Sequence, residues 1–210
     1  MSTRRNFVAG AGGALFSQLT ANKATAAPDK LRIAVLGVNG RGKDHIQGLM
    51  TQPDAEVVCL CDVDLVVANK AADAFEKRYG KRPAIEQDMR KVFDNKNIDA
   101  VTVATPNHWH ALAAIWACQA GKDVYVEKPG SHNIFEGRKL VEAAKKYNRI
   151  VQHGVQLRSS AALQEAVGHL RKGVIGNVYM SRGLVFRSRP SIGKKGVEPV
   201  PEGLNYDMWT

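Results

Sequence analysis

The sequence predicts an α/β fold built on a doubly wound parallel sheet, and two observations lead to this prediction. Short apolar runs alternate with amphipathic helical stretches from residue 31 to residue 152, and a glycine-rich segment directly follows the first apolar run. Strands joined by helical crossovers at this spacing form a parallel sheet that helices cover on both faces. The composition agrees, because 210 residues with 44% hydrophobic and 24% charged residues are typical of a globular protein. Fibrous, collagen-like and wholly disordered chains are excluded.

Each expected element has its own local signal. We expect strands at the apolar runs 31–36, 57–61, 84–86, 99–104, 123–127 and 150–152, of which 84–86 is the weakest. We expect helices over 42–51, 65–79, 88–95, 108–120 and 134–147. Gly80 and Gly121 follow two of these helices, and glycine readily adopts the left-handed conformation that ends a helix. Asn133, with Glu136 three residues later, can cap the last helix. This order of elements indicates a Rossmann-type fold.

The last sixty residues have a different pattern. We expect a helix near 160–172, a strand at 177–186 and then a stretch rich in Gly, Pro and Lys up to Thr210. That strand has no visible partner, and the aromatic side chains of Tyr206 and Trp209 need a surface to pack against. We therefore expect a second domain that is cut short, so that the sequence is a piece of a longer protein.

The first residues are typical of an export signal. Arg4 and Arg5 precede an uncharged stretch over 6–22 and small residues at 24–26. The uncharged stretch is short and diluted by polar residues, which makes it a poor membrane-spanning helix. Residues 3–8 resemble a twin-arginine signal, so we expect the twin-arginine export machinery as a partner, cleavage after Ala26 and a periplasmic protein. An uncleaved signal that tethers the protein to the membrane is the alternative. The expected division is thus 1–26 signal, 27–153 Rossmann domain and 154–210 second domain.

The charge of the chain does not indicate a nucleic-acid partner. The formal net charge is +10, but much of the excess lies in the first 26 residues and in 181–197, which contain no carboxylate. Proteins that bind nucleic acids usually gather basic residues on one element, with aromatic residues or a recognisable motif. We therefore expect no nucleic-acid partner.

The cysteine and histidine residues predict neither disulfides nor a metal site. Cys59, Cys61 and Cys118 form no CxxC pair, and Cys59 and Cys61 share one face of an expected strand, which favours buried thiols. His108 and His110 lie close in the sequence, but no third ligand lies near them. We expect no metal.

The glycine-rich segment after the first strand predicts a dinucleotide site. Gly37 and Gly42 occupy the first and third glycine positions of GxGxxG, Asn39 occupies the second, and Gly40 can relieve the crowding that Asn39 introduces. Such a turn lets backbone amides at a helix start approach a pyrophosphate. Asp62 ends the second strand twenty residues after Gly42, where a carboxylate can accept hydrogen bonds from both ribose hydroxyls.

The identity of the nucleotide depends on two opposed charges. The carboxylate of Asp62 would repel a 2'-phosphate, which favours NAD over NADP. Arg41 lies in the glycine-rich loop, and its guanidinium could instead serve a 2'-phosphate. We expect NAD, with NADP as the weaker alternative and with Arg41 among the residues that contact the cofactor.

Two further segments follow later strands of the expected sheet, where a doubly wound fold gathers its ligand. Residues 105–110 follow the fourth strand and residues 127–130 the fifth. The candidate cofactor contacts in them are Thr105, Pro106, Asn107, His110, Glu127 and Lys128. Pro129 holds Lys128 extended, so the lysine projects from a defined turn and can exchange a proton with a substrate hydroxyl. A cis bond before Pro129 is an open alternative.

Five segments in order carry a resemblance to a known family. They are GVNGRG at 37–42, CDVD at 61–64, TPNHWH at 105–110, EKP at 127–129 and GVQLRS at 154–159. Together they resemble the Gfo/Idh/MocA oxidoreductases, which include glucose-fructose oxidoreductase and inositol dehydrogenase. The resemblance spans about residues 31 to 209, and YDMW at 206–209 resembles the exported bacterial branch.

The resemblance implies roles for particular residues. Lys128 matches the family's catalytic lysine, His110 would lie near the nicotinamide end of the site, and Gln156 lies where a cofactor contact is expected. It also implies that a mainly antiparallel α+β domain follows the Rossmann domain, bears the substrate and builds a homo-oligomer if it is complete. The further catalytic Asp and His of that domain would lie beyond Thr210.

The expected function combines these signals. A cofactor carried out of the cytoplasm in a folded protein meets no free nicotinamide pool, so we expect a tightly held NAD that is recycled in each turnover. The expected substrate is a sugar or polyol that is oxidised by hydride transfer. One alternative is an NAD-dependent glycoside hydrolase that oxidises a glycoside, eliminates and then reduces. Others are a non-catalytic nucleotide-binding sensor and an inactive fragment.

Overall fold

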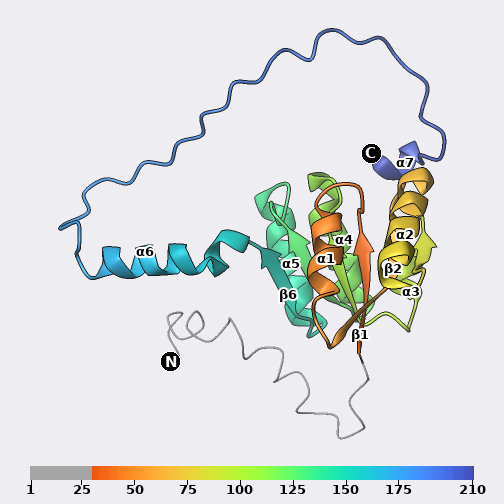
Figure 1. Ribbon diagram of the computed structural model, residues 1–210, viewed down its shortest axis with the longest axis horizontal. Coiled ribbons are helices and arrows are strands. Elements are labelled where there is room, and N and C mark those ends of the chain that lie inside the picture. Colours follow the sequence, from red (N-terminus) through yellow and green to blue (C-terminus); the bar gives the residue numbers. More distant parts are fainter. Residues whose placement is uncertain (1–29) are drawn as a thin grey trace, which may run out of the picture. The chain divides into compact units, whose positions relative to one another are not determined.

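A six-stranded parallel sheet forms the centre of the protein. The computed structural model describes residues 30–210. The strands are β1 Leu31–Leu36, β2 Ala55–Cys61, β3 Ala84–Glu86, β4 Ala100–Val103, β5 Asp123–Glu127 and β6 Val151–Gly154. Their order in the sheet is β3-β2-β1-β4-β5-β6, and every neighbouring pair is parallel (Figure 1). This is the doubly wound Rossmann topology, so the predicted α/β fold is confirmed.

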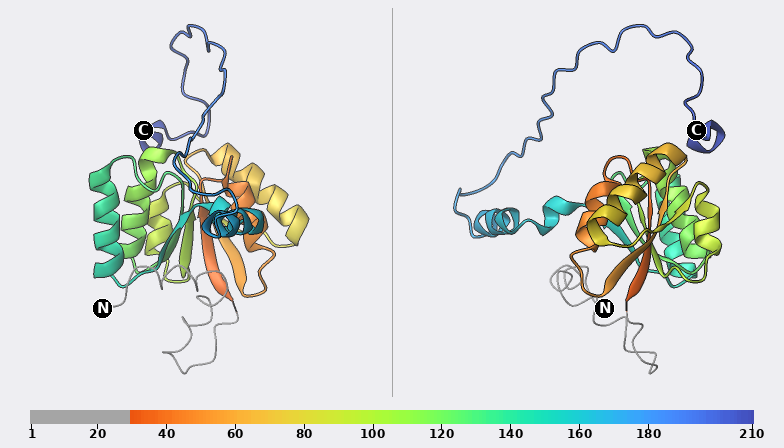
Figure 2. Two further views of the ribbon diagram at one scale, coloured as in Figure 1. Left: turned by 90° about the vertical axis from the view of Figure 1, so that its left-hand side faces the viewer. Right: turned by 45° about the vertical axis from the view of Figure 1, so that its right-hand side comes forward.

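Helices cover both faces of this sheet. They are α1 Gly42–Leu49, α2 Leu65–Tyr79, α3 Met89–Asp94, α4 His110–Gln119 and α5 Ile134–Lys146. Because successive side chains of a strand point to opposite faces, β1 divides its side chains between two cores. Ala34 and Leu36 pack with α3, α4 and α5, whereas Val35 packs with α1 and α2. Figure 2 shows these helices on the two faces of the sheet. Cys59, Cys61 and Cys118 are buried free thiols, as predicted.

The helix ends show why these residues form these elements. The carboxylate of Asp64 accepts hydrogen bonds from the backbone nitrogens of Val66 and Val67 at the start of α2, and Gly80 ends that helix at φ +75°. Asn133 caps α5 by accepting from the backbone nitrogen of Glu136. The predicted range 65–79 and the predicted Asn133 cap are therefore confirmed. The predicted helix 108–120 is divided, because the 3₁₀ turn η1 Asn107–Trp109 precedes α4.

The chain divides into two units, which we call the sheet unit and the second unit. Among the described residues, the sheet unit contains 30–154 and also Pro201–Thr210, whereas the second unit is Val155–Val200. The last ten residues thus differ from the sequence-based division, which assigned all of 154–210 to a second domain. Hydrogen bonds from the backbone nitrogen of Leu65 to Gly203 O and from that of Asn205 to Val63 O join them to the sheet unit.

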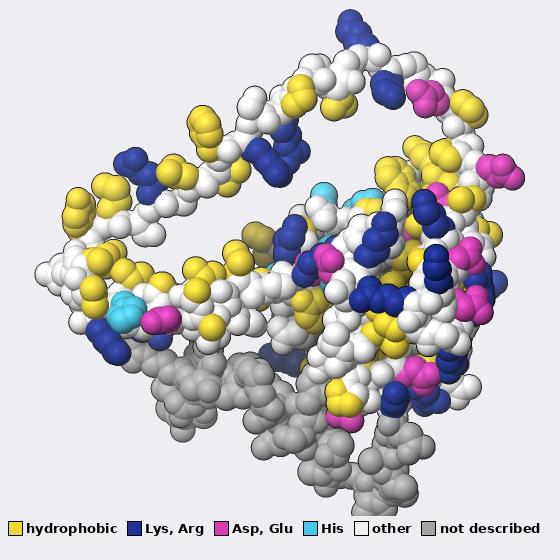
Figure 3. Space-filling model, viewed as in Figure 1, with side chains coloured by type: hydrophobic (Ala, Val, Ile, Leu, Met, Phe, Trp, Pro, Cys, Tyr) yellow, Lys and Arg dark blue, Asp and Glu magenta, His cyan; other side chains and the backbone are white. Residues whose placement is uncertain are grey.

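The second unit corrects one prediction. It contains η2 Gln156–Ser159 and α6 Ala161–Arg171, but residues 177–186 pair with no strand within the described part of the chain. The predicted strand at 177–186 is therefore wrong for this structure, because no strand edge among residues 30–210 pairs with it. Val185 and Phe186 are fully exposed, and Figure 3 shows hydrophobic side chains along this extended stretch.

The predicted signal segment, residues 1–26, lies outside the described residues. Within residues 30–210, no helix combines the length and the apolar character that crossing a membrane requires.

Candidate cofactor and active site

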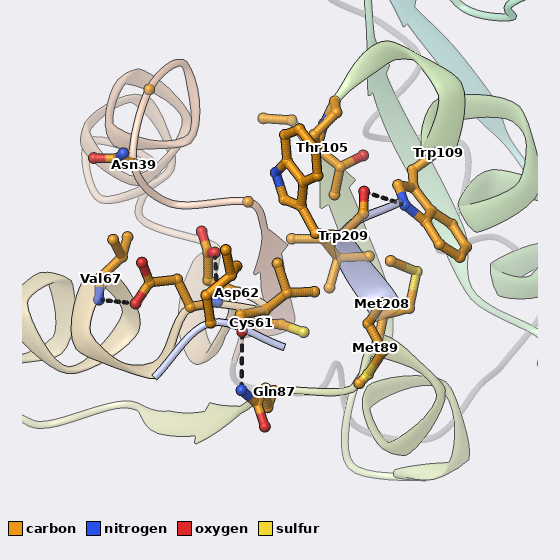
Figure 4. Close-up of a pocket in the computed structure, with 18 residues that line it drawn as sticks. Asn39, Cys61, Asp62, Val67, Gln87, Met89, Thr105, Trp109, Met208 and Trp209 are labelled. Atoms are coloured by element: carbon orange, nitrogen blue, oxygen red, sulfur yellow. Dashed lines mark hydrogen bonds between the residues drawn. The ribbon is translucent and has the colours of Figure 1, made fainter. Parts of the chain in front are cut away.

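A cavity lies where β1, β2 and β4 reach their carboxyl ends. It has a volume of about 450 Å³, which is within the range of small-molecule sites. Six residues predicted from the sequence line it, namely Gly37, Asn39, Gly40, Asp62, Thr105 and Pro106. The residues that sequence reasoning missed are Leu36, Cys61, Val63, Asp64, Val67, Gln87, Met89, Ala104, Trp109, Leu204, Met208 and Trp209. Figure 4 shows these residues as sticks.

Close backbone contacts explain two of the glycines in the loop. Gly37 has φ +82°, and a Cβ there would lie 2.6 Å from the carbonyl oxygen of Ala104. A Cβ on Gly42 would lie 1.9 Å from the carbonyl oxygen of Gly37. A Cβ on Gly40, by contrast, would meet no described atom within 4 Å. Packing of the protein therefore requires Gly37 and Gly42, while Gly40 leaves open space beside the cavity that a ligand can use.

Asp62 is held at the end of β2 by the loops on either side. Its carboxylate accepts hydrogen bonds from the backbone nitrogen of Val38 at 2.9 Å and from that of Asp64 at 3.1 Å. Burial raises the pKa of Asp62 above its ordinary value, although these two hydrogen bonds oppose the shift. Each carboxylate oxygen accepts one backbone hydrogen bond and retains a lone pair, so the two oxygens can also accept from two ribose hydroxyls.

Thr105 brings an unsatisfied polar atom to the cavity. Its Oγ1 is buried and finds no hydrogen-bond partner among the described residues. A buried hydroxyl without a partner carries a free-energy cost that a bound polar group can remove. The Thr105 hydroxyl, the open space at Gly40 and the carboxylate of Asp62 together fit the sugar and phosphate of a dinucleotide.

Glu127 lies at the centre of a charge network in which Glu127 and His45 are buried, whereas Arg41 and Asp44 are exposed. Its Oε1 accepts from Arg41 Nε at 3.0 Å and from His45 Nε2 at 3.1 Å, and its Oε2 accepts from the backbone nitrogen of Lys128 at 3.2 Å. Arg41 Nη1 also donates to Asp44 at 2.7 Å. Arg41 therefore pairs with Glu127 and Asp44. Arg41 does not line the cavity that Asp62 lines, where a 2'-phosphate would be expected.

His110 joins the two loops that carry the predicted site residues. The ring is 2% exposed, and its Nδ1 lies 2.6 Å from Pro129 O while its Nε2 lies 2.8 Å from Thr105 O. Both ring nitrogens are thus occupied by backbone carbonyls. His110 positions the loop of Lys128 against the loop of Thr105, and the structure does not bring its ring to the cavity.

The remaining predicted residues lie at the carboxyl end of the sheet or outside the sheet unit. Lys128 is exposed directly after β5, and its bond to Pro129 is cis. No ion pair or hydrogen bond engages Lys128 Nζ within residues 30–210, and Asn107 is exposed at the start of η1. Gln156 belongs to the second unit. In the described part of the chain, no group of three or more potential metal ligands comes together.

The Glu127 network predicts a pH-dependent contribution to stability. Burial raises the pKa of Glu127, but the hydrogen bonds from His45 and Arg41 outweigh it and lower the pKa to about 2. Since this is below the value of an unfolded glutamate, the contribution is complete above a pH of about 4.5 and is lost as the pH falls toward 2. We expect Glu127→Gln to lower the free energy of unfolding by about 3 kcal/mol at pH 7 and by much less at pH 3.

Urea unfolding of both proteins at several pH values measures this difference. Glu142→Gln is the matched control, because Glu142 pairs with Lys139 on the surface of α5 and should change stability by less than about 1 kcal/mol. An equal loss for Glu127→Gln at pH 7 and pH 3 would contradict the role of the ionised carboxylate.

Comparison with known proteins agrees with this geometry. The family described as "Oxidoreductase family, NAD-binding Rossmann fold" matches residues 31–155. A relative from Saccharopolyspora erythraea named "Glycosyl hydrolase family 109 protein" is 30% identical over 164 residues, which cover 75% of this chain and 35% of the relative. The chain thus spans about a third of that relative's length.

Solved structures with the same fold include two dehydrogenases. Myo-inositol 2-dehydrogenase from Lactobacillus plantarum superposes with a TM-score of 0.63 at 25% identity, over 71% of this chain and 43% of the other. The WlbA dehydrogenase from Bordetella pertussis, solved in complex with NADH and UDP-GlcNAcA, has a TM-score of 0.63 at 27% identity, over 74% of this chain and 43% of the other.

Proposed function

The chain belongs to the Gfo/Idh/MocA family of oxidoreductases with an NAD-binding Rossmann fold, and we propose that it oxidises a hydroxyl-bearing carbon of a sugar, polyol or glycoside by hydride transfer to tightly bound NAD. One observation carries the proposal. His110 contacts Pro129 O and Thr105 O, so the lysine that precedes Pro129 is tied to a loop that lines the cavity. A side chain able to accept a proton therefore lies on a loop fixed to the cofactor site.

The residues of the chain divide the chemistry between them. Bound NAD supplies an acceptor for the hydride. The neutral amine of Lys128 takes the proton of the substrate hydroxyl as the hydride leaves the carbon, so that the alcohol becomes a carbonyl and the lysine an ammonium. Glu127 fixes the backbone of Lys128 by accepting a hydrogen bond from the Lys128 backbone nitrogen. Asp62 holds the ribose at the other end of the site.

A second candidate follows from one comparison. A relative that is 30% identical is named a glycosyl hydrolase family 109 protein, which favours transient oxidation of a glycoside, loss of the leaving group and return of the hydride to the sugar. In a periplasmic protein exported by the twin-arginine route, this cycle needs no free nicotinamide. Transfer of the hydride to a second sugar meets the same condition.

Mass spectrometry of nucleotide released from the denatured protein tests the proposal. We expect NAD in near-stoichiometric amount. Release of NADP would contradict the proposal that Asp62 selects NAD. A folded protein without nucleotide would contradict the proposal that the cofactor is tightly held. A panel of sugars and glycosides added to the holoprotein then distinguishes an enzyme from a sensor, because only an enzyme changes the absorbance of the bound nicotinamide.

Replacing Asp62 tests the choice of nucleotide. We expect Asp62→Ala to weaken NAD binding by about 10- to 100-fold, since two hydrogen bonds to a charged acceptor are lost, and to reduce the discrimination against NADP. Asp62→Asn, which keeps one acceptor oxygen, should lose less affinity. Calorimetric titration with both nucleotides measures these changes, and tighter binding of NADP than of NAD by the parent protein would contradict the assignment.

A further inference from the structure

The end of the chain returns to the carboxyl edge of the sheet and is held there. The backbone nitrogen of Leu65 donates to Gly203 O at 3.0 Å, that of Asn205 donates to Val63 O at 2.9 Å, and Gln87 Nε2 donates to Gly203 O at 3.1 Å. Asp64 and Leu204 form an antiparallel bridge. Residues 203–205 therefore run beside the loop that follows β2.

A second set of contacts fixes the short helix α7 Tyr206–Trp209 against the loop after β4. Trp109 Nε1 donates to Trp209 O at 3.3 Å, and His108 Nε2 lies 3.0 Å from the same oxygen. The Trp209 ring also lies edge-on to the His108 ring, with 6.5 Å between centroids. The segment 203–209 thus spans from the end of β2 to the end of β4, which are the two edges of the cavity.

Gly203 allows this close approach. It has φ +84°, and a Cβ there would lie 2.9 Å from Val66 Cγ2. A larger residue would push the segment away from α2 and would also strain the backbone.

The inner side of this segment is apolar and faces the cavity. Leu204, Met208 and Trp209 line it together with Asp62 from the end of β2 and Thr105 from the loop after β4 (Figure 4). Trp209 is 43% exposed, and Tyr206 stacks on its ring with 5.9 Å between centroids. The part of the ring that Tyr206 leaves uncovered lies at the cavity that Asp62 also lines. An aromatic ring in this position can stack on a flat heterocycle.

The neighbouring residues indicate which half of the cofactor this is. In a doubly wound fold the acidic residue after the second strand binds the adenosine ribose, and here Asp62 lines the cavity whereas Lys128 does not. We propose that residues 203–209 form a wall of the adenine subsite, with Trp209 packing against the adenine ring and Leu204 and Met208 completing the apolar surface. This inference rests on the proposed nicotinamide cofactor and deepens it.

The arrangement joins distant parts of the chain at the proposed cofactor site. The chain leaves the sheet unit after Gly154 and returns at Pro201, so the adenine would be held between the glycine-rich loop and a segment more than 150 residues later.

Binding of nucleotide fragments tests the adenine wall without any measurement of activity. The protein is dialysed against charcoal, and calorimetry then gives its affinity for NAD, ADP-ribose and nicotinamide mononucleotide. We expect Trp209→Ala to weaken NAD and ADP-ribose about tenfold or more while leaving nicotinamide mononucleotide unchanged, and Trp209→Phe to keep most of the affinity. Asp207→Ala, on the same helix but outside the cavity lining, is the matched control and should bind all three as the parent does.

Each outcome decides between the two proposals. Unchanged or tighter binding of ADP-ribose by Trp209→Ala would overturn the adenine wall and leave the proposed function standing. An equal loss with Asp207→Ala would overturn it too, because the effect would then come from the helix as a whole. A parent protein that binds neither NAD nor ADP-ribose would overturn both.

Discussion

Replacing Lys128 by alanine is expected to lower turnover by about 10²- to 10⁴-fold, the usual contribution of a positioned acid or base, and to leave NAD bound. Lys128 is exposed after β5, so its truncation removes no buried contact. The expected result is therefore a loss of kcat with an unchanged cofactor content. Turnover is measured on the full-length polypeptide with the sugar or glycoside that the panel identifies, and the cofactor content by release and mass spectrometry.

A lysine elsewhere on the surface serves as the control for this experiment. Lys70 is exposed on α2, and Lys70→Ala should keep both turnover and cofactor. Unchanged turnover in Lys128→Ala would show that Lys128 is not the proton acceptor of the reaction. Loss of NAD from the same variant would make it a binding residue instead of a proton acceptor.

Replacing Gly42 by alanine is expected to weaken NAD binding by at least about 100-fold. The added methyl group forces the glycine-rich loop to move, which misplaces the backbone amides that would bind the pyrophosphate. The added Cβ would lie 1.9 Å from Gly37 O, and a backbone atom cannot turn aside as a flexible side chain can. We also expect the free energy of unfolding to fall by about 1 to 3 kcal/mol, as for other overpacked positions. Calorimetric titration with NAD and urea unfolding measure the two effects.

Gly48 provides a matched control on the same helix. A Cβ there would meet no described atom within 4 Å, so Gly48→Ala should leave NAD binding unchanged and should stabilise α1 slightly, by about 0.5 to 1 kcal/mol. If Gly42→Ala bound NAD as the parent does, the close contact with Gly37 would not shape the cofactor site.

Local chemistry in the sequence determined most of the sheet unit. The predicted helix 65–79 was correct to the residue because Asp64 and Gly80 supply the two caps that end it. The third strand was the weakest prediction and is present at Ala84–Glu86, where it pairs with β2. Asp62 was placed beside the glycine-rich loop correctly, since parallel strands bring their carboxyl ends to one edge. Such features depend on contacts between near neighbours or on the regular geometry of a sheet.

Only the tertiary structure decided the rest. Arg41 and His45 meet Glu127 across more than 80 residues, and no local pattern specifies which carboxylate a guanidinium will find. The strand expected at 177–186 is absent, because alternating apolar residues form a strand only where the edge of another strand supplies hydrogen bonds. Tyr206 and Trp209 were expected to need a surface to pack against, but the sequence did not specify which surface. Trp209 lines a cavity whose other walls include the loops after β1, β2 and β4, far away in the chain.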